Sequence, residues 1–295
     1  MSIGKFLSPK NDLAFKRIFG TEKNKDILIH FLNDIFGRTT NPIEHVKFLK
    51  TSQEPEIAAQ RVSIVDVMCE DLEGNKFIIE MQVDSEKGFE QRAQYYAAKT
   101  YIEQRAKGID FHDLKEVTFL AITEFSLFPE KKGYLSHHQM LDIDTYERNL
   151  KDFSFSFLEL AKFKKSKKEL MTMTEKWAYF FKNAAKTDEK DLDLIIGDDL
   201  IIKKAYEELN RFSWTPQELR TYDSIDMKQS ADKAVNEMAF DKGMEKGKTE
   251  GRTEGKVEGA TEATENIARA MKKKKINIDI IAETTGLTAE EIDIL

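Results

Sequence analysis

The chain has 295 residues and a formal net charge of −7, from 46 lysines and arginines against 53 aspartates and glutamates. This length suits one large or two modest domains, and the acidic balance argues against a nucleic-acid coat protein but not against a nuclease. No apolar run approaches the roughly 20 residues of a membrane span, the N-terminus lacks a signal-peptide core, and the single Cys69 excludes an internal disulfide and a cysteine-based zinc site. We therefore expect a cytoplasmic protein without a membrane partner.

One helix or two short helices are predicted near the N-terminus, over residues 10–36. Asn11 or Asp12 can cap the first helix. Apolar residues at three- and four-residue spacings continue up to Gly37, which is a typical C-terminal stop. Residues 45–50 then predict a first short strand.

The stretch 62–83 predicts a β-hairpin. Two runs rich in Val and Ile flank a turn that contains Gly74-Asn75, a typical hairpin signal. Polar side chains interrupt these otherwise apolar strands at Asp66, Glu80 and Gln82.

The spacing of these polar side chains indicates a shared site. Symmetric pairing about Glu73 would set Asp66 opposite Glu80, and Gln82 would share the face of Glu80 because strand side chains alternate. Two facing carboxylates repel each other unless something neutralises them, and hard cations such as Mg²⁺ prefer carboxylate oxygens. The structural alternatives are a salt bridge from Asp66 to Arg61 and a solvated edge-strand position for Glu80.

Helix and strand alternate after the hairpin. Residues 89–107 predict a long helix that ends at Gly108. Residues 117–123 are apolar throughout, as in a central strand buried on both faces, and 153–160 alternate like another strand. This order fits helices packed around a small mixed sheet.

Helical patterns dominate the last third. Residues 167–240 are helical in pattern, and 201–212 form one amphipathic helix within them. Five glycines then recur every fourth residue within 241–260. Because each glycine costs about 1 kcal/mol in a helix, this segment is either a charged flexible tether or a marginal helix whose glycine stripe admits a second helix.

Residues 261–295 predict a compact tail of a helix, a short helix, a turn and a last helix. Thr288 is placed as an N-cap and Glu291 completes a capping box. The small core predicted for this tail consists of Ile280, Ile281, Leu287, Ile292 and Leu295.

The order of five segments resembles a bacterial nuclease family. The segments are NDLAFKRIFG (11–20), IIEMQV (78–83), FEQRAQYY (89–96), FLAITEFSLFP (119–129) and FLELAKFKK (157–165). Together they are similar to the recombination-promoting nucleases, also described as PD-(D/E)XK nuclease family transposases, over roughly residues 5–255. Gln82 stands where lysine is usual in the wider superfamily, and glutamine is the pattern of this family.

This resemblance implies an α/β fold with a restriction-endonuclease-like core, in which helices flank a small mixed β-sheet. A helical region and a C-terminal helical tail would follow the core. The implied divisions of the chain are the nuclease core 5–165, the helical region 166–240, the glycine repeat 241–260 and the tail 261–295.

The implied activity is a Mg²⁺-dependent DNA endonuclease, with Mn²⁺ as a possible substitute, that breaks DNA and promotes recombination. Asp66 and Glu80 would ligate the metal together with the backbone carbonyl of Met81. Gln82 carries no charge, but its amide can orient the attacking water. The alternative function is a non-catalytic nuclease-fold scaffold, or a DNA-binding protein, that acts through self-association of its C-terminal region as a homo-oligomer.

Three further side chains are candidates for DNA contacts. Arg92 and Tyr96 are four residues apart, so they share a helix face, and the forked donors of Arg92 suit a phosphate. A salt bridge from Arg92 to Glu103 or another acid is the structural alternative. Lys16, in the first predicted helix, is a weaker candidate whose alternative is an ordinary surface cation.

Overall fold

The computed structural model describes residues 4–53 and 63–295. The chain forms two compact units, residues 1–228 and residues 229–295, and each unit is considered by itself. Within the described ranges, no helix is both long and apolar enough to cross a lipid bilayer.

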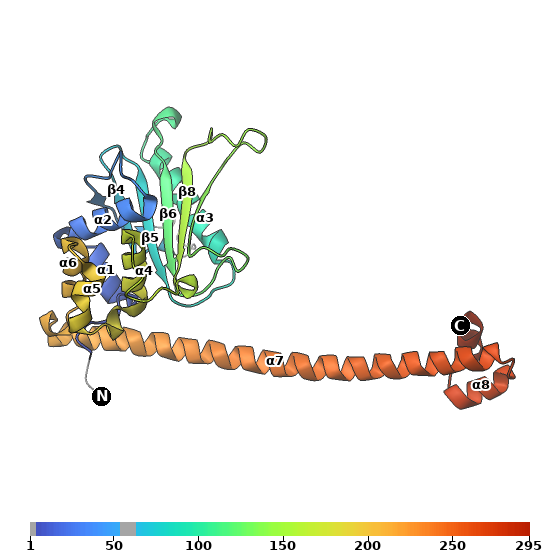
Figure 1. The fold of residues 1–295 in the computed structure, drawn as a ribbon. Helices are drawn as coiled ribbons and strands as arrows, with labels where there is room; N and C mark the ends of the chain where they lie inside the picture. Colours follow the sequence, from blue (N-terminus) through green and yellow to red (C-terminus); the bar gives the residue numbers. More distant parts are fainter. Residues whose placement is uncertain (1–3, 54–62) are drawn as a thin grey trace. The chain divides into compact units, whose positions relative to one another are not determined.

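A six-stranded mixed sheet lies at the centre of the first unit (Figure 1). Three parallel strands, β5, β6 and β8, form its middle, and antiparallel strands complete both edges. The predicted fold class, an α/β core with helices around a small mixed sheet, is confirmed. In sheet order the strands are β1 (Lys47–Phe48), β4 (Val67–Glu70), β5 (Lys76–Gln82), β6 (Val117–Thr123), β8 (Phe153–Glu159) and β7 (Leu135–Gln139).

Strand β6 is buried along its whole length, as its apolar sequence predicts. Leu120 and Ile122 point into a large core on one face of the sheet. Phe119 and Ala121 point into a smaller core on the other face. The sheet therefore separates two apolar layers, and each layer is closed by helices.

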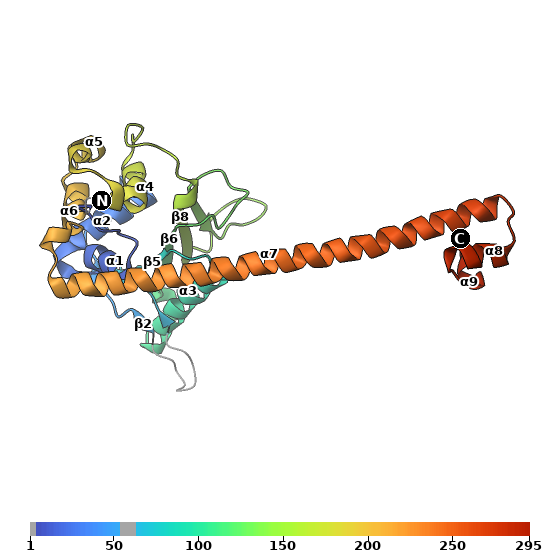
Figure 2. The ribbon, with the colours of Figure 1, turned by 90° about the horizontal axis from the view of Figure 1, so that it is seen from below.

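Helix α3 covers the smaller core, and the remaining helices of the first unit cover the larger one (Figures 1 and 2). The predicted cap of the first helix is present, since the Asn11 side chain accepts from the N–H of Leu13 at 3.0 Å. Gly37 ends the second helix with a φ of 61°, as predicted. These helices are α1 (Asp12–Phe19), α2 (Lys25–Phe36), α3 (Phe89–Ala106), α4 (Met173–Asn183), α5 (Leu192–Ile196) and α6 (Leu200–Glu208).

The predicted hairpin is present, and its register is the predicted one. Val67 pairs with Ile79 and Glu70 pairs with Lys76, so the two strands are symmetric about residue 73. Gly74 lies in the turn with a φ of 87°, a conformation that glycine adopts at little cost.

The first strand of the hairpin is shorter than predicted. Asp66 lies in a bend before β4, and the residues ahead of it, β3 (Ser63–Ile64), pair with β2 (Ser52–Gln53) instead. The carboxylate of Asp66 accepts a hydrogen bond from the N–H of Met81 at 2.8 Å, which replaces a backbone bond of the ladder. Arg61, the alternative partner of Asp66, lies outside the described residues.

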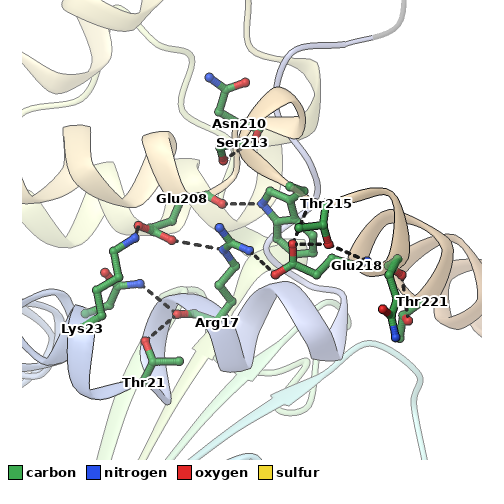
Figure 3. Close-up of polar contacts among 12 residues, drawn as sticks. Arg17, Thr21, Lys23, Glu208, Asn210, Ser213, Thr215, Glu218 and Thr221 are labelled. Carbon is green, nitrogen blue, oxygen red and sulfur yellow. Dashed lines mark hydrogen bonds and ion pairs between the residues drawn. The ribbon is translucent and has the colours of Figure 1, made fainter.

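A polar network ties α1 to the start of the long helix α7 (Pro216–Lys273) (Figure 3). The guanidinium of Arg17 donates to Glu208 at 3.2 Å and to Glu218 at 2.7 Å. It also lies 4.6 Å from the ring centre of Trp214. Arg17 therefore has a structural role, because both carboxylates and the indole hold its charge.

In the second unit, α7 continues as a helix through all five repeated glycines. Of the two alternatives, tether and helix, the structure has the helix.

In the first unit, the predicted amphipathic helix 201–212 is shorter than expected, because α6 ends at Glu208.

The C-terminal tail folds back on the end of α7 as α8 (Ile278–Thr285) and α9 (Ala289–Ile294). The predicted capping box is present at the start of α9. Ile281 and Ile292 are buried against Ala268, but Ile280 is 52% exposed, so its predicted place in this core is wrong. Adjacent helical residues point about 100° apart, so a small core that takes Ile281 leaves Ile280 outside.

Candidate functional site

The hairpin residues singled out by sequence lie at the carboxyl end of β5. Glu80 and Gln82 alternate with residues of the larger core, so they point toward the face that α3 covers. Ala121 pairs with Glu80 on the neighbouring strand β6. Its methyl group occupies little space, which leaves room beside the carboxylate of Glu80.

Asp66 approaches this position from the bend before β4. One carboxylate oxygen accepts the N–H of Met81 at 2.8 Å, and the other lies 3.8 Å from the ammonium of Lys16. Burial raises the pKa of Asp66, and the negative charge of Asp12 adds to this effect, while the Met81 N–H and Lys16 oppose it. The carboxylate is therefore held in place but is not fully neutralised by protein groups.

Glu80 is the most perturbed carboxyl group of the site. It is 7% exposed, and its oxygen Oε2 is buried with no hydrogen-bond partner in the described part of the chain. Burial raises the pKa of Glu80 to about 7, and the charge of Asp66 contributes to the rise, whereas Arg92 lowers it. The negative charge of Asp66 thus acts on Glu80 in a desolvated place.

Arg92 of α3 closes the site from the helical side. Its Nη2 donates to Glu80 Oε1 at 3.0 Å and to Gln82 Oε1 at 2.7 Å. Its Nη1 pairs with Glu86, and no ion pair with Glu103 occurs in residues 4–53 and 63–295. The alternative predicted for Arg92 was a salt bridge with Glu103 or another acid, and the structure has such salt bridges with Glu86 and with Glu80 of the candidate site.

The other candidates differ in how closely they approach the carboxylates. Tyr96 lies one turn beyond Arg92, and burial together with the charge of Glu80 raises the pKa of its phenol. Lys16 reaches Asp66 as described above. The amide of Gln82 donates to the carbonyl of Asp84 at 2.9 Å, so the amide plane is fixed at both ends.

Asp12 is a residue that sequence reasoning did not assign to the site. It was considered only as a helix cap, yet its charge acts on Asp66. Its position in the segment 11–20 was the available signal, because that segment carries part of the family resemblance.

The donor set fits a hard divalent cation in part. Two carboxylates with raised pKa values and one unpartnered buried oxygen are what a cation would satisfy. No group of three or more His, Cys, Asp or Glu side chains able to hold a metal ion is present in the described ranges. A third protein ligand from the described residues would therefore be a backbone, amide or hydroxyl oxygen.

Glu80→Gln is expected to stabilise the fold at high pH. Because the folded-state pKa is raised from 4.5 to about 7, the contribution of Glu80 to stability falls as pH rises between these values. At about 1.4 kcal/mol per pH unit, the free energy of unfolding above pH 7 is lower by about 3 kcal/mol than at low pH. The neutral amide of Glu80→Gln would restore this free energy.

Urea denaturation at pH 5 and pH 8 measures this effect. The gain in unfolding free energy of Glu80→Gln over wild type should be larger at pH 8 than at pH 5. Glu86→Gln is the matched control, because Glu86 pairs with the same arginine but its side chain is 55% exposed. An equal gain at both pH values would contradict the electrostatic origin.

Comparison with known proteins gives one match. The family model described as PD-(D/E)XK nuclease family transposase matches residues 9–238, a range that contains the whole six-stranded sheet and the candidate site. Searches among curated proteins and among solved structures found no match.

Proposed function

Because the chain belongs to the PD-(D/E)XK nuclease family transposases, we propose that it is a cytoplasmic, divalent-metal-dependent DNA endonuclease. Membership indicates a nuclease- or transposase-like activity. The observation that carries the finer proposal is that Asp66 accepts the N–H of Met81 beside Glu80 and raises the pKa of Glu80, whose Oε2 has no hydrogen-bond partner among the described residues. The reaction would be hydrolysis of a phosphodiester bond, and the breaks would promote recombination.

Asp66, Glu80 and the backbone carbonyl of Met81 are the proposed metal ligands. The N–H of Met81 points to Asp66, and in a strand the N–H and C=O of one residue point to the same side, so this carbonyl faces Asp66 too. When bound, Mg²⁺ or Mn²⁺ would stabilise charge on the phosphate and acidify a water molecule.

Gln82 is proposed to orient the attacking water through its amide, which both donates and accepts hydrogen bonds. Its present contacts fix the amide plane between Arg92 and the Asp84 carbonyl. A water molecule that is held in the reactive orientation attacks faster even where no charged side chain activates it.

Arg92, Tyr96 and Lys16 are proposed to contact DNA. The Nη1 of Arg92 pairs with Glu86, whose side chain is 55% exposed, and a pair of this kind contributes little. The Nη1 of Arg92 could therefore exchange Glu86 for a phosphate oxygen at little cost in free energy. Its Nη2 would stay bonded to Glu80. Lys16 is 43% exposed at its side chain and can turn from Asp66 to a phosphate.

The test is conversion of supercoiled plasmid to nicked or linear product, with Mg²⁺, with Mn²⁺ and with EDTA. Product that requires the metal and disappears in Asp66→Ala supports the proposal. A folded wild-type protein that yields no product with either metal overturns it. In that case the alternative, a non-catalytic scaffold or DNA-binding protein, would account for the Arg92–Glu80 ion pair as a structural contact.

Self-association through the second unit is a further part of the proposal. Apolar side chains along its helix stay exposed, among them Phe240 at 69% and Val257 at 62%. A Cβ at any glycine from Gly243 to Gly259 would meet no atom within 4 Å, so a second helix could approach closely.

Truncation after Phe240 is expected to lower the oligomeric mass while the first unit stays folded, because the exposed helix and its tail would supply the contact. Light scattering of both proteins measures the mass. Equal subunit numbers in the full-length and truncated chains would show that the second unit does not mediate association.

A further inference from the structure

We propose that Lys10, Lys164 and Lys182 form a phosphate-binding cluster that holds the DNA backbone next to the candidate site. The cluster is separate from Arg92, Tyr96 and Lys16. This inference rests on the proposed function, because it identifies how the DNA substrate of that site would be held.

Lys182 anchors the cluster at the end of α4. Its ammonium donates to the carbonyl of Leu160 at 2.9 Å and to the carbonyl of Phe163 at 2.5 Å. Phe163 directly precedes Lys164, so the Lys182 ammonium lies beside the backbone that carries Lys164. Two carbonyl oxygens fix the position of the Lys182 ammonium but do not cancel its charge.

Lys10 joins the cluster through Glu124. The two side chains form an ion pair at 2.6 Å, and both act electrostatically on Lys182 together with Lys164. Among the described residues, Glu124 is the carboxylate whose charge raises the pKa of Lys182.

The cluster carries excess positive charge in a partly desolvated place. The positive charges of Lys164 and Lys10 and the negative charge of Glu124 act on Lys182, and burial together with Lys164 lowers the pKa of Lys182. Lys164 is exposed and has no ion pair in the described part of the chain. Like charges gathered in this way repel each other, and a bound anion would relieve that repulsion.

The position of the cluster favours a DNA phosphate over a free small anion. Strands β5, β6 and β8 are parallel, so their carboxyl ends lie at one edge of the sheet. Gln82 ends β5, Glu124 follows β6, and Lys164 follows β8. The N–H of Glu124 donates to the carbonyl of Gln82 at 3.0 Å. The carboxylates of the candidate site, Asp66 and Glu80, reach this edge from the α3 face. Lys182 reaches it from the opposite face. A DNA strand carries one phosphate charge per roughly 3.4 Å of helix axis. A strand that crosses this edge of the sheet would therefore meet both the candidate site and the lysine cluster.

The experiment measures the affinity of the full-length protein for a fluorescent DNA duplex in EDTA at several salt concentrations, by anisotropy. Lys164→Gln and Lys10→Gln are each expected to reduce the slope of log K against log salt by about 0.9, which is about eightfold in affinity at 0.1 M salt. Lys164→Arg should keep the wild-type slope. Lys47→Gln is the control, because Lys47 lies 74% exposed beside Glu70, near the opposite end of β5.

Wild-type slopes in both glutamine variants, or an equal loss in Lys47→Gln, would overturn the cluster. The proposed function would survive that result if wild-type protein still binds and cuts DNA. A wild-type protein that does not bind the duplex would overturn the cluster, whereas the plasmid assay with Mg²⁺ or Mn²⁺ decides the proposed function. Thermal unfolding of each variant checks that folding is unchanged.

Discussion

Asp66→Ala is expected to reduce metal-dependent plasmid cleavage roughly a thousandfold, since a metal ligand supports several kcal/mol of transition-state stabilisation. Folding should persist. The substitution removes one hydrogen bond to Met81, worth about 1 kcal/mol, but it also removes a buried charge whose raised pKa shows that burial disfavours it. The cleavage rate and the midpoint of thermal unfolding are the two measurements.

Glu73→Ala is the matched control for Asp66→Ala, because Glu73 lies in the turn of the same hairpin, away from the site. It should cut at the wild-type rate. Asp66→Asn separates ligand loss from loss of the Met81 contact, since the amide oxygen can still accept that N–H. If Asp66→Ala cuts normally, Asp66 is not a metal ligand.

Gln82→Ala is expected to slow cleavage about a hundredfold, the scale of losing one positioned polar group. Gln82→Lys should retain or partly restore activity, because lysine is usual at this position in the wider superfamily. The negative charges of Glu80 and Glu86 would offset the repulsion between the new ammonium and Arg92. Single-turnover rates at saturating DNA distinguish this effect from weaker binding.

Gln94→Ala serves as the control for Gln82→Ala. Gln94 is exposed on α3, and its amide donates to the carbonyl of Glu90 in its own helix at 3.1 Å. It should leave the single-turnover rate unchanged. An undiminished rate in Gln82→Ala would remove Gln82 from the mechanism.

The sequence by itself determined the elements whose signals are local. The hairpin register follows from the turn at Gly74 and the two apolar runs, and the structure has that register. Strand β6 was predicted from seven consecutive residues suited to burial on both faces. The caps at Asn11 and Thr288 follow from side chains that bond a backbone N–H two or three residues away.

Strand β7 shows where such signals fail. Its sequence, LSHHQ, neither alternates clearly nor forms an apolar run, and it is a strand because it pairs with the edge of β8. The sequence also left the glycine repeat undecided between tether and helix, since glycine lowers helix propensity while the regular spacing opposes a random linker.

Only the tertiary structure decided how the charges are paired. Arg17 is held by Glu208 and Glu218, about 200 residues along the chain, and no periodicity connects such positions. Arg92 meets Glu80 and Gln82 because α3 packs over the end of β5. The reason is physical: local patterns report which face of an element is buried, whereas a charge finds its partner through the packing of elements distant in sequence.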